Sequence, residues 1–355
     1  MAKTKRSISQ KQQKILSLFL EYGTLSSSEV QGNLQTIREE SALVTVKRAL
    51  SQITSMGLLT VSGAGPSTVY TISALGRIVA DVDARAYCAV EPDKRYGLSS
   101  YNFELLPALP VDLFSEKEQS RMEVATAEYR TRTTDVPPAI QKKELERLVI
   151  ELSWKSSKIE GNTYTLLDTE KLILEHTEAP GHPKSEAVMI LNHKSAFDFV
   201  REHRDAFIEF SRANMETVHA FLVKDLDVGS GLRKKAVGVL GSKYKPLDNI
   251  HQIRDTVKEL ARAVVTMGSA YAKALVALVG ISYIQPFEDG NKRTARLMAN
   301  ALLMAHDCAP LSYRSVDEVA YREAILVFYE LNSLVPFKKI FVEQYNFAAR
   351  NYSMK

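Results

Sequence analysis

The sequence has few cysteines and no long apolar run. Only Cys88 and Cys308 are cysteines, so a disulfide scaffold and a cysteine-based zinc site are excluded. The longest apolar runs, such as Ala274–Ile281, fall far below the roughly 20 residues that a membrane-spanning helix needs. No hydrophobic segment of a secretory signal follows the charged first residues. We therefore expect a cytoplasmic protein with no membrane partner.

Net charge is also small, at +4, but it is distributed unevenly. Residues 1–80 carry nine Lys or Arg against four Asp or Glu, and they include a basic arm of Lys3, Lys5 and Arg6. The rest of the chain is close to neutral. This distribution predicts that a polyanionic partner such as DNA would bind at the N-terminal segment.

Length and composition indicate an ordinary globular protein of two or three domains. The 355 residues are 45% hydrophobic and 25% charged. Several prolines, ending with Pro137 and Pro138, lie between residues 81 and 138. We predict a first domain at residues 1–80, a connecting region at 81–137, and a second domain at 138–355.

The first domain has the pattern of three short helices followed by two strands. Apolar spacing predicts helices at Gln12–Tyr22, around Val30 and Leu34, and at Ser41–Met56. Alternating apolar and hydroxyl residues then predict strands at 58–62 and 68–72. This order resembles the winged helix-turn-helix family.

In a winged helix-turn-helix, the third helix enters the DNA major groove. That placement would bring Thr45, Lys47, Arg48 and Gln52 to DNA. A winged helix that contacts only protein is the alternative, because the predicted wing tip carries no Lys or Arg. The basic arm favours DNA, since phosphate contacts dominate affinity.

The most informative segment is a loop that leads into a helix, Ile284–Leu303. Gly290 permits backbone conformations that other residues avoid. Free N–H groups, the helix dipole, and the guanidinium groups of Arg293 and Arg296 would converge at the start of the helix. Asp289 could hold a magnesium ion between phosphates. These residues predict a nucleotide-phosphate cradle.

This segment resembles the motif His-x-Phe-x-Asp/Glu-Gly-Asn-Gly/Lys-Arg-x-x-Arg of the Fic domain, whose members mostly transfer AMP from ATP to a protein hydroxyl. The matching residues are Phe287, Asp289, Gly290, Asn291, Lys292, Arg293 and Arg296, with the usual Pro286 before them. The resemblance covers roughly residues 138–352. It includes a helix at 321–325 and a stretch similar to the β-hairpin flap that docks target side chains, with Gly241, Tyr244 and Pro246.

The resemblance implies a role for each matched position. Asp289 would bind Mg²⁺, and Asn291 would contact the α-phosphate region of ATP. Arg293 and Arg296 would hold the β- and γ-phosphates. The backbone amides of residues 290–292 would complete the cradle.

One position departs from the pattern, because Gln285 stands where the motif has its catalytic His. In the family that His takes the proton from the target hydroxyl, and an amide cannot act as a base near pH 7. Nucleotide binding should survive where transfer is crippled. Three explanations remain open: a natural pseudoenzyme that senses nucleotide, a transferase of low activity or altered mechanism, and an engineered inactivating substitution.

None of the seven histidines lies in the motif, so none there replaces the missing base. His219 is predicted to pack within a helix, and His176 and His182 have no nearby partners that would make a metal site.

A second family signature lies upstream, at Ser156-Ser-Lys-Ile-Glu160-Gly161. It resembles the inhibitory helix of autoregulated Fic proteins, here expected near residues 153–162. The resemblance implies that Glu160 reaches Arg296 and occupies the place of the γ-phosphate. Independently, a helix that ends at Gly161 can present a carboxylate to an arginine cluster, where it imitates a phosphate oxygen. The alternative is an ordinary surface glutamate at a helix end.

Together these features predict a mainly helical protein, a Fic helical bundle with a small β-hairpin flap preceded by a winged helix-turn-helix. The predicted function is an autoinhibited adenylyltransferase scaffold that binds ATP and Mg²⁺ and acts on a protein target or on itself. A nucleotide-sensing DNA-binding regulator without catalysis is the main alternative, and a protein-interaction module is a third. The protein could also form a homo-oligomer.

Overall fold

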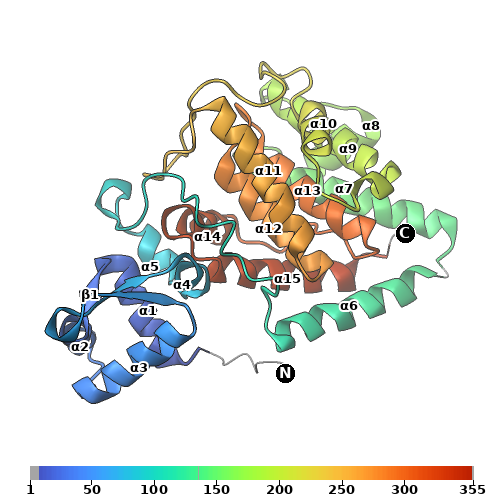
Figure 1. Cartoon of the computed structure of the whole chain (residues 1–355). Coiled ribbons are helices and arrows are strands. Elements are labelled where there is room, and N and C mark those ends of the chain that lie inside the picture. The colour runs from blue at the N-terminus through green and yellow to red at the C-terminus, as the bar shows by residue number, and fades with distance from the viewer. Residues whose placement is uncertain (1–7, 135, 354–355) are drawn as a thin grey trace. The chain divides into compact units, whose positions relative to one another are not determined.

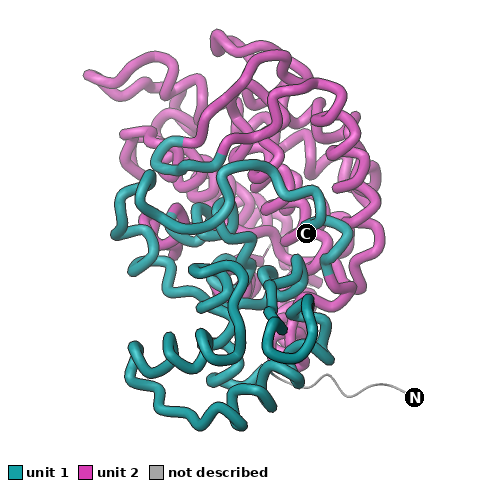
Figure 2. The backbone as a smooth tube through the Cα atoms, turned by 60° about the vertical axis from the view of Figure 1, so that its left-hand side comes forward, with its two compact units in different colours: residues 1–109, 240–244, 323–337 teal, residues 110–239, 245–322, 338–355 magenta. Residues whose placement is uncertain are grey.

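A computed structural model describes residues 8–134 and 136–353 (Figure 1). The basic arm of Lys3, Lys5 and Arg6 lies outside the described residues. The chain divides into two compact units, shown in Figure 2. Unit 1 comprises residues up to 109 with 240–244 and 323–337, and unit 2 comprises residues 110–239, 245–322 and 338–355.

Unit 1 begins with the predicted three helices and two strands, and it adds a short first strand. Its elements are α1 (Gln10–Tyr22), β1 (Leu25–Ser26), α2 (Ser27–Thr36), α3 (Leu43–Ser55), β2 (Leu59–Ser62), β3 (Val69–Ile72), α4 (Ala74–Val79) and α5 (Ala84–Cys88), with 3-10 turns at Gly65–Ser67 and Pro92–Lys94. The strands form an antiparallel sheet in the order β1-β3-β2.

Local sequence signals explain these elements well. The hydroxyl of Ser26 accepts a hydrogen bond from the N–H of Glu29, and the Glu29 side chain returns the contact, so a capping box starts α2. The apolar face of α3, with Val46, Leu50 and Ile53, is fully buried in the core of this unit. The predicted helical spacing of these residues is thereby confirmed.

The regular elements of unit 2 are all helices, within the residues that the structure describes. Its elements are α6 (Glu116–Thr134), α7 (Pro138–Ile159), α8 (Leu166–Glu175), α9 (Lys184–Glu202), a 3-10 turn (Arg204–Phe207), α10 (Arg212–Leu222), α11 (Ile250–Thr266), α12 (Ala270–Ile284) and α13 (Asn291–Ala305). Two last helices, α14 (Glu318–Leu331) and α15 (Val335–Asn351), have residues in both units.

Helices α12 and α13 form the centre of unit 2 and pack against each other. Nearly every residue of α12 is buried, because the helix is apolar all round. Helix α11 packs against α12, and α7, α9 and α10 contact α13 or one another. Gly280 allows the close approach of α11, since a Cβ there would lie 2.3 Å from Leu260. This packing sets the direction in which α13 presents its first turn.

The compact units do not coincide with the predicted domains. They divide after residue 109, and the predicted connecting region 81–137 contains both α5 of unit 1 and α6 of unit 2. Helix α6 is highly charged and has little apolar periodicity, but Met122 and Ala125 are fully buried. The prolines indicated a connecting region, and the long helix α6 forms within it.

The β-hairpin predicted at 241–246 is absent, because every strand in the described residues belongs to the sheet of unit 1. The carbonyl of Gly241 accepts a hydrogen bond from Arg95 at 3.0 Å. Tyr244 is buried with its ring 5.7 Å from that of Tyr329. These contacts hold the segment through side chains, and an isolated bridge at Lys245 does not extend into a strand. The Tyr244 ring is consequently not exposed to a target.

Within residues 8–134 and 136–353, no helix has the combined length and hydropathy needed to cross a lipid bilayer.

Candidate functional site

The predicted cradle is a tight loop between α12 and α13. Helix α12 ends at Ile284, and its cap residue Gln285 turns the chain with a left-handed backbone (φ 51°). Helix α13 begins after Gly290 (φ 76°). Asn291 closes the loop by accepting from the N–H of Phe287 and donating to its carbonyl, both at 2.8 Å. No side chain caps the start of α13. Its first amides are therefore available to an anion.

Arg293 lies in the first turn of α13, almost completely buried. Its guanidinium donates to the carboxylate of Asp289 at 3.1 Å, and that carboxylate is 66% exposed. Burial lowers the pKa of Arg293, although Asp289 and Glu160 partly offset the effect. The group stays charged at neutral pH, because an arginine does not deprotonate in proteins.

Glu160 reaches this turn from the end of α7. One carboxylate oxygen accepts from Arg296 at 2.9 Å, and the other accepts from Lys292 at 3.3 Å. Burial alone would raise the pKa of Glu160, but the two cations more than offset it, so the pKa lies below its ordinary value. The carboxylate is therefore ionised and seated between two positive charges.

Arg296 is held rigidly for this contact. Its guanidinium also donates to the hydroxyl of Ser156 at 2.9 Å and to the Ser156 carbonyl at 2.8 Å. The side chain is fully buried. Burial disfavours its charge, but the nearby Glu160 raises the pKa of Arg296 above its usual value. The structure thus brings together Ser156, Glu160 and Arg296, as the sequence predicts.

The end of α7 is also held from a second helix. Glu160 is the C-terminal cap residue, and Gly161 follows in a left-handed conformation (φ 102°). Arg322 of α14 donates from Nε to the carbonyl of Ile159 at 2.9 Å. A cation at the last carbonyls of a helix is favourable. The Glu160 side chain is therefore held by Arg296 and Lys292, and the backbone just before it is held by Arg322.

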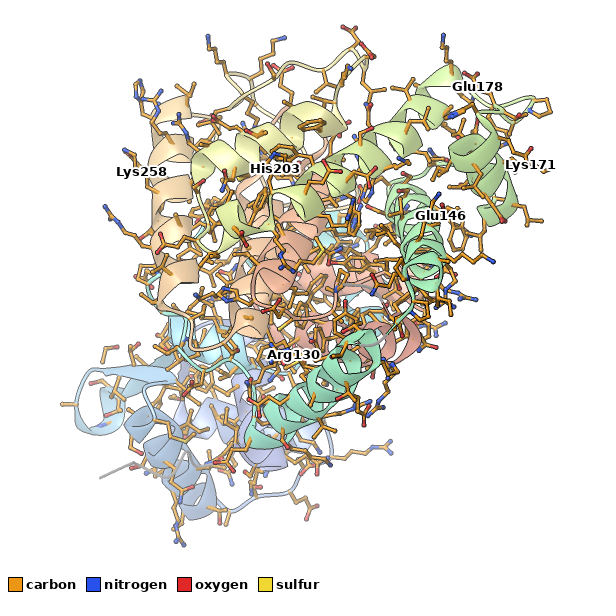
Figure 3. The ribbon with its side chains drawn as sticks, turned by 90° about the vertical axis from the view of Figure 1, so that its right-hand side faces the viewer. Arg130, Glu146, Lys171, Glu178, His203 and Lys258 are labelled. Atoms are coloured by element: carbon orange, nitrogen blue, oxygen red, sulfur yellow. The ribbon has the colours of Figure 1, made fainter. Side chains whose placement is uncertain are left out.

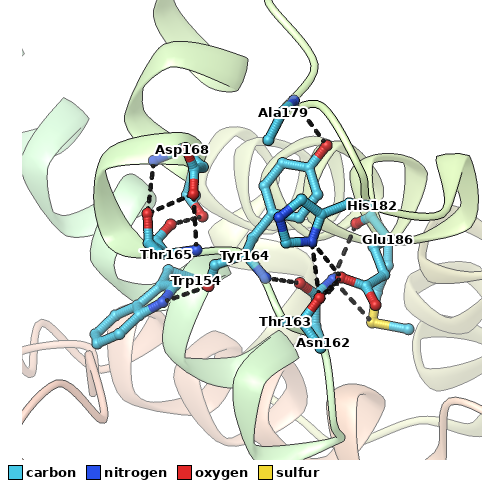
Figure 4. A network of polar contacts seen from close by, with 11 residues as sticks. Trp154, Asn162, Thr163, Tyr164, Thr165, Asp168, Ala179, His182 and Glu186 are labelled. Atoms are coloured by element: carbon cyan, nitrogen blue, oxygen red, sulfur yellow. Dashed lines mark hydrogen bonds and ion pairs between the residues drawn. The ribbon is translucent and has the colours of Figure 1, made fainter.

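The chain after Gly161 is anchored by the network in Figure 4. The Asn162 side chain donates to the backbone of Glu186, and the N–H and hydroxyl of Thr163 donate to the Glu186 carboxylate at 2.9 and 2.8 Å. His182 lies 2.8 Å from the same hydroxyl. This network joins the segment after Glu160 to the start of α9.

The lowered pKa of Glu160 predicts an acid-sensitive contact. Its stabilisation is complete above the unfolded pKa of about 4.3 and is lost as the pH falls through the lower folded pKa. We expect Glu160→Gln to lower the free energy of unfolding by about 2 kcal/mol near neutral pH. Thermal unfolding of both proteins across acidic pH measures the difference. A difference that stays constant down to the most acidic conditions would contradict this assignment.

Gln285 directs its side chain back to its own helix. The amide nitrogen donates to the Ser282 carbonyl at 2.6 Å, and the residue is 7% exposed. His219 lies against the loop from α10, fully buried as predicted, and burial lowers its pKa to about 4. Neither side chain supplies a base for the exposed face of the loop.

The predicted DNA-contacting residues share an exposed surface of α3. Thr45, Lys47, Arg48 and Gln52 are all exposed, and Gln52 also accepts a hydrogen bond from Gln12 at 3.2 Å. They belong to unit 1 and the cradle belongs to unit 2, so the two predicted sites lie on separate parts of the chain.

A magnesium ion fits Asp289 as a single ligand. Across the described ranges, no three His, Cys, Asp or Glu side chains gather to hold a metal. Magnesium commonly takes one or two carboxylates, and waters and substrate phosphates complete its shell. An exposed carboxylate at the mouth of the cradle satisfies that requirement.

Three contacts could not be read from the motif. Lys292 shares Glu160 with Arg296, Arg322 holds the end of α7, and His219 holds the loop. Each joins segments far apart in sequence, so no spacing rule indicates it. The only sequence signal was the helical placement of His219.

Comparison with known proteins identifies the unit that carries the cradle. Residues 209–303 match the model of the Fic/DOC family. The chain contains a Fic domain. The matched segment includes the cradle loop and α13 as far as residue 303, while α7 lies outside it.

The chain is similar to a protein adenylyltransferase. Protein adenylyltransferase fic-1 of Caenorhabditis elegans is 24% identical over 162 residues, which is 43% of this chain and 31% of the relative. The match therefore spans about a third of that relative's length.

Solved structures share the fold of the Fic domain. Fic-1 of C. elegans superposes with a TM-score of 0.57 at 18% identity, over 66% of this chain and 72% of that one. A Fic domain containing signaling protein of Bacteroides thetaiotaomicron gives 0.56 at 15%, over 64% and 94%. A Fic family protein of Desulfovibrio desulfuricans gives 0.55 at 18%, over 68% and 75%. The mainly helical fold predicted from the sequence is confirmed.

Proposed function

We propose that this Fic domain binds Mg-ATP at the start of α13 and that Glu160 obstructs the site from within the same chain. The observation that carries the proposal is the pairing of Glu160 with Arg296 at 2.9 Å and Lys292 at 3.3 Å. A carboxylate between two cations imitates a phosphate oxygen. Because Glu160 belongs to the same chain, no separate inhibitor is needed.

The charges at the cradle favour a polyphosphate. Arg293, Arg296 and Lys292 lie within one and a half turns of the uncapped start of α13. Lys292 and Arg296 already bind the carboxylate of Glu160, and Arg293 binds that of Asp289. Several positive groups at a helix N-terminus suit a ligand with several negative charges. A nucleoside triphosphate supplies them, with Arg293 and Arg296 on the β- and γ-phosphates.

Asn291 acts mainly by shaping the site. Both polar atoms of its amide bond the backbone of Phe287, so the side chain holds the loop closed. Asp289 would hold the magnesium ion, which when bound neutralises phosphate charge. The amides of residues 290–292 would face the phosphates.

The reaction that this scaffold supports is transfer of AMP to a hydroxyl of a protein target or of the chain itself. The similarity to a protein adenylyltransferase supports this reaction class. In that step the hydroxyl oxygen bonds to the α-phosphorus, pyrophosphate leaves, and the hydroxyl proton needs an acceptor. Gln285 cannot take that proton. We therefore infer that ATP binding is retained and transfer is impaired.

Titration of Mg-ATP into a Glu160→Ala variant tests this proposal directly. Alanine suits the backbone of residue 160 (φ −90°, ψ 4°), so the helix end should be preserved. Arg296→Ala in the same background is the control that should not bind.

A second candidate function is a DNA-binding regulator whose Fic domain senses nucleotide. Three helices, an antiparallel sheet, and an exposed α3 surface with Lys47 and Arg48 favour it. A regulator of this kind would bind ATP at the same cradle but would not transfer AMP. A change in DNA affinity on adding ATP would favour the regulator.

We expect Lys47→Ala/Arg48→Ala to weaken binding to mixed-sequence duplex DNA by about ten-fold or more. The loss of two cations should also reduce the salt dependence of binding. Lys171→Ala/Lys258→Ala is the matched control, because these lysines are exposed on α8 and α11 of the other unit (Figure 3). Gel-shift titration at several salt concentrations measures both effects. Equal affinities for the two variants would place the DNA surface elsewhere or rule out DNA binding.

A further inference from the structure

Two buried side chains, Arg233 and His219, bind backbone carbonyls of the cradle loop. The Gln285 carbonyl accepts from Nε of Arg233 at 2.6 Å, and Arg233 is 2% exposed. The Asp289 carbonyl, next to the start of α13, lies 3.0 Å from Nε2 of His219. Neither donor belongs to the loop. Both come from parts of unit 2 that precede it by 50 residues or more, with spacings of 52 and 70.

His219 makes two separate contacts with the loop. Its ring stacks on Phe287 with centroids 3.7 Å apart and planes only 6° from parallel. Its Nε2 must carry the hydrogen toward Asp289, because a carbonyl oxygen can only accept. Gly290 also lies directly on α10, since a Cβ there would be 3.3 Å from Val223 and 3.5 Å from His219. The helix is therefore a close support for this turn.

The hydrogen bond to Asp289 decides which way the next peptide faces. In a trans peptide the C=O and the following N–H point to opposite sides. With the Asp289 carbonyl held toward His219, the N–H of Gly290 points away from α10. Glycine also tolerates the flipped peptide, which would turn the carbonyl oxygen outward. A partial negative charge would then face the anion in place of a donor.

We propose that His219 is a positioning residue of the phosphate cradle, which keeps the peptide between Asp289 and Gly290 oriented with its N–H toward the bound polyphosphate. This role rests on the proposed function and deepens it. His219 acts through the loop and does not contact the nucleotide. Its stacking on Phe287 fixes the ring so that the donor stays in place.

The test uses the full chain with Glu160→Ala, in which the cradle is unobstructed. To this parent we add His219→Gln or His219→Met, side chains of similar length of which only glutamine carries an N–H donor. We expect the methionine variant to bind Mg-ATP about ten-fold more weakly and the glutamine variant to bind within about three-fold of the parent. Adenosine, measured by competition, should bind all three proteins alike, because it has no phosphate.

Each outcome separates the two claims. Equal Mg-ATP affinities of the methionine and glutamine variants, or an equal loss for adenosine and ATP, would overturn the role of His219 and leave the proposed function standing. A parent that binds no Mg-ATP would overturn both. If the methionine variant has no cooperative thermal transition, His219→Phe replaces it, because phenylalanine keeps the stack without the donor and should show the same loss.

Discussion

Gln285→His in the Glu160→Ala background should raise the rate of AMP transfer by about 10²–10⁴-fold. A general base at this position would accept the hydroxyl proton that glutamine cannot, which corresponds to about 3–5 kcal/mol of barrier. Residue 285 is left-handed (φ 51°), a conformation that histidine adopts more readily than most residues. Incorporation of label from ATP labelled on its α-phosphate, into the chain itself or into added proteins, measures the rate.

Gln285→Asn is the matched control for this experiment. Asparagine also tolerates the left-handed backbone, and its amide likewise cannot act as a base. Labelling by the histidine variant alone would show a transferase silenced at residue 285. Labelling already in Glu160→Ala would show that the glutamine permits transfer, so the cost assigned to the missing base is too large. No labelling in any variant would favour a nucleotide sensor.

Glu160→Ala should tighten Mg-ATP binding by about 10–100-fold. In the parent chain, ATP must displace a carboxylate from Arg296 and Lys292, and hydrogen bonds between charged groups contribute about 1.5–3 kcal/mol each. Removing Glu160 also leaves the fully buried Arg296 without its counter-charge, which destabilises the folded protein. Bound ATP should restore much of that stability, because it supplies the missing negative charge.

Calorimetry gives the affinity, and thermal unfolding with and without Mg-ATP gives the stability. Glu146→Ala is the matched control, since it removes a carboxylate from the same helix α7 where the side chain is 41% exposed and its only ion pair in the described chain is with Lys142 at 3.9 Å. The control should leave affinity and stability unchanged. An affinity for Glu160→Ala equal to that of the parent chain would mean that Glu160 does not compete with phosphate.

The short-range features of this protein could be predicted because each depends on residues close in sequence. The capping box at Ser26 and Glu29 starts α2, and the apolar spacing of α3 marks its buried face. The cradle loop is equally local. Gly290 allows the turn, and Asn291 closes it on Phe287 only four residues away.

Predictions that depended on contacts between distant segments were less complete. The segment at 241–246 was expected to pair as a hairpin, but contacts with Arg95 and Tyr329 hold it in an irregular conformation. Those partners lie about 150 residues before it and about 90 residues after it. Prolines in the region 81–137 indicated a connecting region, and the charged helix α6 has too little apolar periodicity to be recognised from the sequence.

The sequence by itself determined the chemical groups of the cradle, since a glycine turn followed by two arginines at i and i+3 places both charges on the first turns of one helix. It also indicated Glu160 as their partner through a recognised pattern. Only the tertiary structure decided that Lys292 shares that carboxylate, that Arg322 holds the end of α7, and that His219 contacts the loop. The reason is physical: helix periodicity fixes which face a side chain occupies, whereas the packing of α7, α10 and α14 decides what that face meets.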